Sequence, residues 1–278
     1  MGLSKQVDEI PTSNRRLTSV EGHPSATSPK HPGRTAWMAH AALTLLLICA
    51  AGSAVVTPVG GSRAGANNAT PDPIVFVHGF GGSIGGHELF FSAGMVPWLK
   101  SQGFPADHIF VFTYDADESI YDVMPRLSSF VDGALRATGA DKVDLVTHSK
   151  GGLIARGYVA LLGGSAHVDG FAAIASTLSG GEIPFCGQLP IGRECLNNLP
   201  NSPLVNKLNA LDPTPGPARY ATWWSRCDGV VKPVLSATLP GADNHEQPCD
   251  LLSGLANNHL TMPLNPRIWN EVYGFVAS

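Results

Sequence analysis

The stretch VDLVTHSKGGL, residues 143–153, carries the strongest indication of the fold. Its first six residues predict a buried strand, and residues 153–162 predict the helix that follows. Ser149 lies on the tight turn between them, where Gly151 lets the backbone fold sharply without a side-chain clash. The pattern is G-x-S-x-G with threonine in place of the first glycine. It predicts a serine hydroxyl at the carboxyl edge of a sheet; the alternative is a serine that only caps the helix.

Strands and helices alternate around this stretch. Apolar runs at residues 74–78, 108–114 and 171–176 predict three further buried strands. Apolar residues at helical spacing predict a helix over residues 119–138, which Gly139 ends. The alternation predicts an α/β fold with a mostly parallel central sheet and helices on both faces.

The regular pattern breaks down over residues 177–217, which are rich in proline and glycine and have no apolar periodicity. A long irregular segment in a compact domain is usually functional, so we expect it to cover a cleft beside Ser149. The alternative is a flap that packs on the sheet away from that serine. Periodic structure resumes at residues 218–225 and 234–239, and a last helix is expected near residues 266–276.

A glycine-rich turn, His78-Gly79-Phe80-Gly81-Gly82, follows the first predicted strand. Acyl transfer needs N–H donors aimed at the oxygen that becomes negative in the tetrahedral intermediate. With a serine on a strand–turn–helix, these donors are the amide of the next residue, Lys150, and one of the early glycine turn, Phe80. The alternative is a plain turn between strand and helix. A nucleotide is not expected, because neither G-x-G-x-x-G nor G-x-x-x-x-G-K-[ST] is present here.

A serine nucleophile needs a base to take its proton and an acid to orient that base. In this architecture the acid precedes the histidine along the chain, and both follow the serine. Asp228 directly follows WWSRC, at the expected end of a strand, and is the predicted acid. Asp212 and Asp243 are the alternatives.

The predicted base is His259, in a polar loop just before the last helix. His245 is the alternative, because Asn244-His245-Glu246 also reads as a polar loop. His78 and His148 flank the two predicted chemical turns, but each stands at a strand end. We therefore expect these two histidines to form structural hydrogen bonds rather than to transfer protons.

Four segments together resemble the class 2 bacterial lipases, small secreted lipases and esterases of the α/β-hydrolase fold, and their actinobacterial branch in particular. The segments are PIVFVHGFGGS (73–83), VDLVTHSKGGL (143–153), SRCDGVV (225–231) and NHLTMPLNP (258–266). The resemblance implies cofactor-free hydrolysis of carboxylic esters, acylglycerols among them. It implies Ser149 as nucleophile, Asp228 as acid, His259 as base, and the amides of Phe80 and Lys150 as the oxyanion hole. The chain departs from the family at Thr147, usually a small residue, and at Lys150, where an apolar residue is frequent.

The N-terminal region has a different composition. Residues 1–36 are basic and without apolar periodicity, which predicts disorder. Residues 37–54 have the apolar core of a signal peptide, and the alternative is an uncleaved membrane anchor. Residues 55–72 read as a linker and residues 73–278 as the α/β-hydrolase catalytic domain. We therefore expect a secreted protein, or one anchored by its N-terminal segment.

Four cysteines follow this segment, namely Cys186, Cys195, Cys227 and Cys249. An even number in an exported chain predicts two disulfides. Three connectivities are possible, and pairing of nearest neighbours closes the smallest loops. A Cys227–Cys249 bridge would tether the acid's loop to the segment that leads to the base. None of the four has CxxC spacing, so no metal is expected.

Composition limits the partners. The 278 residues have 14 % charged and 44 % hydrophobic side chains and a net charge of −4, and no basic run is long enough to follow a nucleic acid. We expect a monomeric hydrolase whose partner is a small-molecule or lipid ester, with contact to a lipid interface. Alternatives are a thioesterase, a cutinase-like polyesterase or an amidase with the same residues, or a non-catalytic binding module of the same fold.

Overall fold

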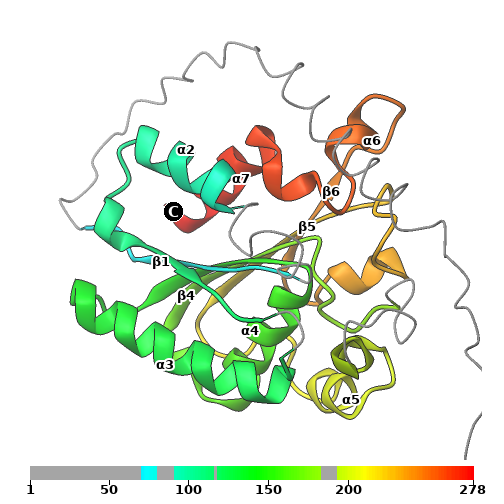
Figure 1. Ribbon diagram of the computed structural model, residues 1–278, viewed down its shortest axis with the longest axis horizontal. Coiled ribbons are helices and arrows are strands. Elements are labelled where there is room, and N and C mark those ends of the chain that lie inside the picture. The colour runs from blue at the N-terminus through cyan, green and yellow to red at the C-terminus, as the bar shows by residue number, and fades with distance from the viewer. Residues whose placement is uncertain (1–69, 80–90, 116–117, 183–192) are drawn as a thin grey trace, which may run out of the picture. The chain divides into compact units, whose positions relative to one another are not determined.

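The computed structural model describes residues 70–79, 91–115, 118–182 and 193–278, and Figure 1 draws the other residues as a thin grey trace. The expected disordered region, signal or anchor, and nearly all of the linker lie outside the described residues, as do Phe80 and Cys186. Among the helices of the described part, none is long and apolar enough to cross a membrane.

A six-stranded sheet with only parallel neighbours forms the centre of the domain, in the order β2-β1-β3-β4-β5-β6. This confirms the predicted α/β fold. The strands are β1 (Ile74–Val77), β2 (Ile109–Phe112), β3 (Val143–His148), β4 (Val168–Ile174), β5 (Arg219–Ser225) and β6 (Asp243–Gln247). The chain runs from β1 outward to β2 and returns to β3 on the other side of β1. The connections that follow β1 and β3 therefore lead to opposite sides of the sheet. Ligands bind at such a point in open α/β sheets.

Two apolar layers hold helices on the two faces of the sheet. Residues of β1 alternate between them, since Ile74 and Phe76 belong to one buried cluster and Val75 and Val77 to the other. In Figure 1, α2 (Val96–Ser101) and α7 (Pro266–Val276) cover one face, and α3 (Ile120–Thr138) and α4 (Lys150–Leu161) cover the other. The remaining helical segments are η2 (Phe91–Met95), η3 (Ala106–His108), η4 (Gly164–Ala166), η5 (Arg193–Asn198), α5 (Pro203–Asn209), η6 (Val234–Ala237), α6 (Ser253–Ala256) and η7 (Met262–Leu264).

The ends of α3 follow local sequence signals. The Ser119 side chain accepts a hydrogen bond from the Tyr121 N–H at the start of the helix, and Gly139 ends it with φ 72°. The helix predicted over residues 119–138 is therefore confirmed. By contrast, α4 begins at Lys150, earlier than expected, because Gly151 and Gly152 are accommodated inside the helix.

The polar loop predicted at residues 244–246 was wrong, because these residues lie in a strand. Residues 234–237 form a 3-10 helix, and the next strand is β6, which contains the predicted polar loop Asn244-His245-Glu246. Most of this strand is exposed, so it lacks the apolar pattern that reveals a buried strand. Backbone pairing with β5 at the edge of the sheet decides its conformation.

The described part of the irregular segment 177–217 packs on the domain. Leu204, Val205 and Leu208 of α5 are buried in the same apolar cluster as α4. Arg156 of α4 donates hydrogen bonds to the Leu178 carbonyl at 2.7 Å and the Leu208 carbonyl at 2.9 Å. This part therefore packs on the domain, but its first residue, Thr177, donates its N–H to the Ser149 carbonyl at 3.3 Å. Residues 183–192 lie outside the described residues, so a cover over a cleft beside Ser149 stays a prediction.

Candidate active site

Ser149 occupies the turn between β3 and α4 in a strained backbone conformation. Its φ is 55° and its ψ is −128°. A positive φ outside glycine costs free energy, on the order of 1–3 kcal/mol. The Ser149 N–H donates to the Ile174 carbonyl of β4 at 3.2 Å, and the Ser149 carbonyl accepts from Gly152 at 3.1 Å. The neighbouring strand and the new helix thus hold the serine in this conformation.

Two glycines allow the turns after β1 and β3 to touch. A Cβ on Gly151 would lie 2.3 Å from the Val77 carbonyl oxygen, and one on Gly79 would lie 2.5 Å from the Cβ of Ser149. A side chain at either position would force the two turns apart. Gly79 therefore borders Ser149. Lys150, the first expected oxyanion donor, begins α4 directly after the serine.

His259 joins Ser149 to Asp228. Its Nε2 lies 3.0 Å from Ser149 Oγ, and its Nδ1 lies 2.9 Å from Asp228 Oδ2. All three residues are buried, with no more than 5 % of each exposed. A histidine in this position can accept the serine proton at Nε2 while its Nδ1–H donates to the carboxylate.

The loop after β5 keeps Asp228 ionised. Its Oδ1 accepts hydrogen bonds from the N–H groups of Val230 at 2.8 Å and Val231 at 2.9 Å. Burial alone would raise the pKa of Asp228, but the hydrogen bond from His259 and these two backbone donors hold the pKa below its ordinary value. The sequence order predicted the aspartate but did not reveal the two backbone donors.

His148 holds the backbone of the histidine loop. Its Nε2 lies 3.0 Å from the His259 carbonyl oxygen, so Nε2–H is the donor. Burial, helped by the nearby His259, lowers the pKa of His148 to about 3, which keeps the ring neutral at ordinary pH. The structural role predicted for this histidine agrees with the contact.

Tyr114 holds the turn after β1, a role the sequence did not suggest. Its hydroxyl donates to the His78 carbonyl at 2.8 Å, and its ring stacks on the His78 ring with centroids 4.2 Å apart. The His78 Nε2 accepts from the Tyr114 N–H at 3.3 Å. Tyr114 follows β2 in the apolar run HIFVFTY, which is the only sequence signal of its position.

The Lys150 side chain is fully buried, which is unusual for a lysine. Its Nζ donates to the Glu118 carbonyl at 3.1 Å and lies 5.6 Å from the centroid of the Tyr114 ring. The side chain thus connects the residue after Ser149 to the segment before α3. An apolar side chain could not make this hydrogen bond.

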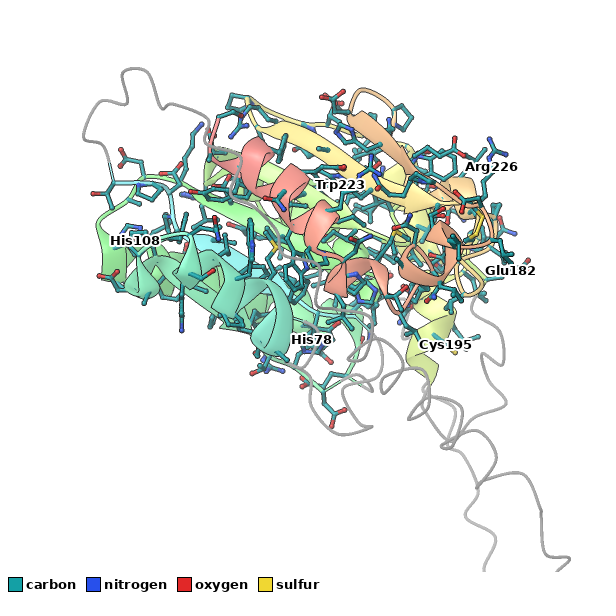
Figure 2. All side chains as sticks on the ribbon, turned by 90° about the horizontal axis from the view of Figure 1, so that it is seen from above. His78, His108, Glu182, Cys195, Trp223 and Arg226 are labelled. Atoms are coloured by element: carbon teal, nitrogen blue, oxygen red, sulfur yellow. A yellow bond between two sulfur atoms is a disulfide. The ribbon has the colours of Figure 1, made fainter. Side chains whose placement is uncertain are left out.

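The rival residues lie elsewhere. His245 stacks on Trp223 with ring centroids 5.0 Å apart. Trp223 in turn donates to Glu271 of α7, and Figure 2 labels it beneath that helix. Asp243 begins β6, while the Asp212 carboxylate accepts a hydrogen bond from the backbone of Thr214. None of the contacts described for His245, Asp243 and Asp212 involves Ser149.

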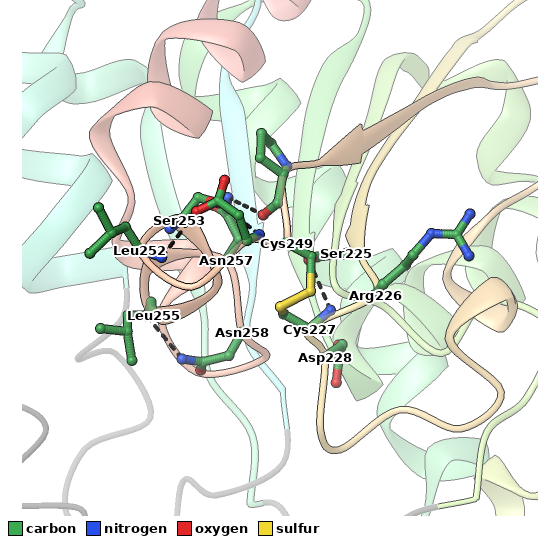
Figure 3. Close-up of a disulfide and its surroundings, with 12 residues drawn as sticks. Ser225, Arg226, Cys227, Asp228, Cys249, Leu252, Ser253, Leu255, Asn257 and Asn258 are labelled. Carbon is green, nitrogen blue, oxygen red and sulfur yellow. Dashed lines mark hydrogen bonds between the residues drawn. A yellow bond between two sulfur atoms is a disulfide. The ribbon is translucent and has the colours of Figure 1, made fainter.

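A disulfide braces the site on the Asp228 side. Cys227 and Cys249 are bonded, with their Cα atoms 5.4 Å apart, as the expected pairing of neighbours requires (Figure 3). Cys195 is also disulfide-bonded, and Cys186 lies outside the described residues. Within the described part of the chain, no cluster of three or more His, Cys, Asp or Glu could hold a metal ion.

Comparison with solved structures shows the fold of lipases and esterases. The chain matches Bacillus licheniformis lipase BlEst2 in its mature form at 14 % identity and a TM-score of 0.58, over 78 % of this chain and 96 % of that one. It matches Aspergillus fumigatus lipase B at 16 % identity and a TM-score of 0.60, over 78 % and 55 %. A gene product of Listeria innocua matches at 16 % identity and a TM-score of 0.55, over 74 % and 94 %.

A family model described as Lipase (class 2) matches residues 71–246. This range includes the glycine turn, Ser149 and Asp228 but ends before His259. The matched part spans more than half of the chain and agrees with the resemblance carried by the four sequence segments. The chain belongs to the class 2 lipase family.

Proposed function

We propose that Ser149, His259 and Asp228 are the catalytic triad of an exported lipase or carboxylesterase that forms an acyl-enzyme. That the chain is an ester-hydrolysing enzyme follows from its family. The observation that supports the triad is the continuous contact from Ser149 Oγ through both ring nitrogens of His259 to the Asp228 carboxylate, at 3.0 and 2.9 Å.

In the first half of the proposed reaction, Ser149 Oγ attacks the ester carbonyl carbon. The hydroxyl proton passes to His259 Nε2, and the carbonyl oxygen becomes negative. The amides of Lys150 and Phe80 are the proposed donors to that oxygen. When the carbon–oxygen bond to the alcohol breaks, the leaving oxygen takes the proton from His259 Nε2.

In the second half, water takes the place of the alcohol. His259 Nε2 accepts a proton from the water as its oxygen attacks the acyl carbon, and then returns a proton to Ser149 Oγ when the acid leaves. Asp228 stays ionised throughout and stabilises the positive imidazolium. The lowered pKa of Asp228 suits this role, because the carboxylate must not take the proton itself.

Export is the second part of the proposal. The Cys227–Cys249 disulfide supports it, since disulfides persist in oxidising compartments. The apolar segment 37–54 would direct the chain out of the cytoplasm, with residues 1–36 before it, a linker to residue 72 and the catalytic domain over residues 73–278.

Hydrolysis of p-nitrophenyl esters from C2 to C16 tests the reaction. Ser149→Ala should lower kcat by about 10⁴- to 10⁶-fold for every ester, because the nucleophile is removed. Its circular dichroism spectrum should match that of the wild type. A variant that keeps a tenth of the normal turnover would show that another residue attacks. The same series measures the preferred acyl chain length.

A further inference from the structure

An exposed apolar surface lies on the loop that carries His259. The three most exposed large apolar side chains of the described residues are here: Leu251 is 91 % exposed, Leu252 80 % and Leu255 70 %. Leu260, next to His259, is 49 % exposed. We call these four residues the leucine cap. In Figure 3, Leu252 and Leu255 point to the same side, away from the disulfide.

The leucine cap stands on a braced support. A Cβ on Gly254 would lie 2.7 Å from Cys227 Sγ, so α6 packs directly against the Cys227–Cys249 disulfide. The Leu255 carbonyl accepts hydrogen bonds from Thr261 Oγ1 at 2.8 Å and Asn258 Nδ2 at 3.0 Å. The exposed leucines therefore do not result from a poorly bonded loop.

The cap and the base share this support. His259 lies between the two residues, Asn258 and Thr261, that bond back to the Leu255 carbonyl. Asn257 Nδ2 donates to the Pro248 carbonyl at 2.9 Å and closes the loop at its start. Whatever surface the leucines contact is thereby held beside the Ser149–His259 pair.

The charges around the cap favour an uncharged partner. Between residues 248 and 262 the only Asp, Glu, Lys or Arg is Asp250, and its Oδ1 accepts from the N–H groups of Leu252 and Ser253, both at 3.0 Å. Beside Cys227, Arg226 pairs with Glu246 at 2.6 Å, and the Lys232 Nζ donates to the Asp228 carbonyl at 2.7 Å. The segment that carries the leucines therefore has no cation of its own to recognise anionic headgroups.

We propose that the leucine cap docks the enzyme on the surface of an uncharged lipid aggregate, such as an acylglycerol droplet. Isolated exposed leucines are ordinary, but a cluster of them marks an interaction site. The proposal rests on the lipid ester hydrolysis proposed above, because docking here brings the lipid surface to the mouth of the site. Binding grows with the apolar area buried, so loss of several leucines should release the protein.

Binding is measured separately from hydrolysis, on a Ser149→Ala background that cannot consume the lipid. The cap variant replaces Leu251, Leu252 and Leu255 with serine. Leu162→Ser is the matched control, since Leu162 is 42 % exposed and follows the far end of α4. Flotation with trioleoylglycerol emulsions and with phosphatidylcholine vesicles, with and without 30 % phosphatidylglycerol, gives the partition coefficients.

The cap variant should bind the emulsion at least tenfold less, equal to about 1.4 kcal/mol. Leu162→Ser should bind like the wild type, and phosphatidylglycerol should not strengthen binding. Equal binding by the cap variant would overturn the proposal, and so would tighter binding to anionic vesicles. Dimerisation in sedimentation that the cap variant abolishes would also overturn it, because the occupant would be a second copy.

With an intact Ser149, the cap variant should lose far more activity on the emulsion than on soluble p-nitrophenyl butyrate. Equal losses on both substrates would show that the leucines act through His259 and would overturn docking. If the wild type hydrolyses no ester at all, the proposed function fails. The binding measurement still decides docking in that case.

Discussion

Replacing Ser149 with glycine should give a more stable protein than replacing it with alanine, and both changes should remove activity. The serine has φ 55° and ψ −128°, a conformation that favours glycine. Ser149→Ala removes the hydroxyl and its contact with His259 but keeps the Cβ and therefore the strain. Ser149→Gly removes both. The difference between the two variants isolates the free energy stored in the backbone of the turn.

The magnitude follows from two opposing effects. Relief of the strain at one such residue is worth on the order of 1–3 kcal/mol. Glycine loses more freedom on folding than alanine, which costs about 0.5–1 kcal/mol. The free energy of unfolding of Ser149→Gly should therefore exceed that of Ser149→Ala, by about 1 kcal/mol when both effects take middle values. At a position without strain the glycine variant should be the less stable of the two, because only the entropic cost of ordering glycine remains.

Urea unfolding followed by tryptophan fluorescence measures the difference. Both variants should be inactive on p-nitrophenyl butyrate and should unfold with the same m-value. A second pair, Ser176→Ala and Ser176→Gly, provides the reference for an ordinary buried position, since Ser176 has no positive φ. If Ser149→Gly is less stable than Ser149→Ala by the same margin as the reference pair, the turn stores no strain and the reasoning fails.

Three further predictions concern the base, a buried acid and the disulfide. His259→Ala should lose as much kcat as Ser149→Ala, whereas His245→Ala should stay within a few-fold of wild type; exchanged outcomes would refute the choice of base. Burial raises the pKa of Asp144 from 3.8 to about 8, so the folded protein keeps a proton that the unfolded chain releases as the pH rises between these values. Wild-type stability should therefore fall over this range relative to Asp144→Asn, by up to about 1.4 kcal/mol per pH unit in urea titrations, and parallel pH profiles would contradict the assignment. Cys227→Ser/Cys249→Ser should lower the free energy of unfolding by about 2–4 kcal/mol and reduce activity below the unfolding transition, whereas unchanged activity up to that transition would show that the bridge does not support the site.

The parts of the fold with strong local signals could be predicted from the sequence. Continuous apolar runs revealed β1 and β3, and helical spacing with a terminal glycine revealed α3. β6 could not be found this way, because DNHEQ is polar and its strand conformation comes from pairing with β5. The same absence of a local signal made His245 a rival for the base.

The contacts of the site depend on how distant turns meet. Chain order and polar loops were enough to name Ser149, Asp228 and His259, but no spacing in the sequence indicates that Tyr114 bonds to the His78 carbonyl. Such contacts arise where neighbouring strands end together, and they depend on the strand order rather than on any one segment.

The loop of His259 carries the proposed base, one end of a disulfide and the exposed leucines, three features that the sequence shows only separately. Cys249 anchors its start to Cys227, the residue before Asp228, so one disulfide restrains both the proposed acid and the proposed base. The His148 ring, one residue before Ser149, donates to the His259 carbonyl at 3.0 Å, which connects the third member of the proposed triad to the same support. The exposed leucines stand on this loop and not on a separate lid. A lipid surface that binds them would therefore contact the enzyme through the element that also positions the proposed base, and binding and catalysis would share one rigid support.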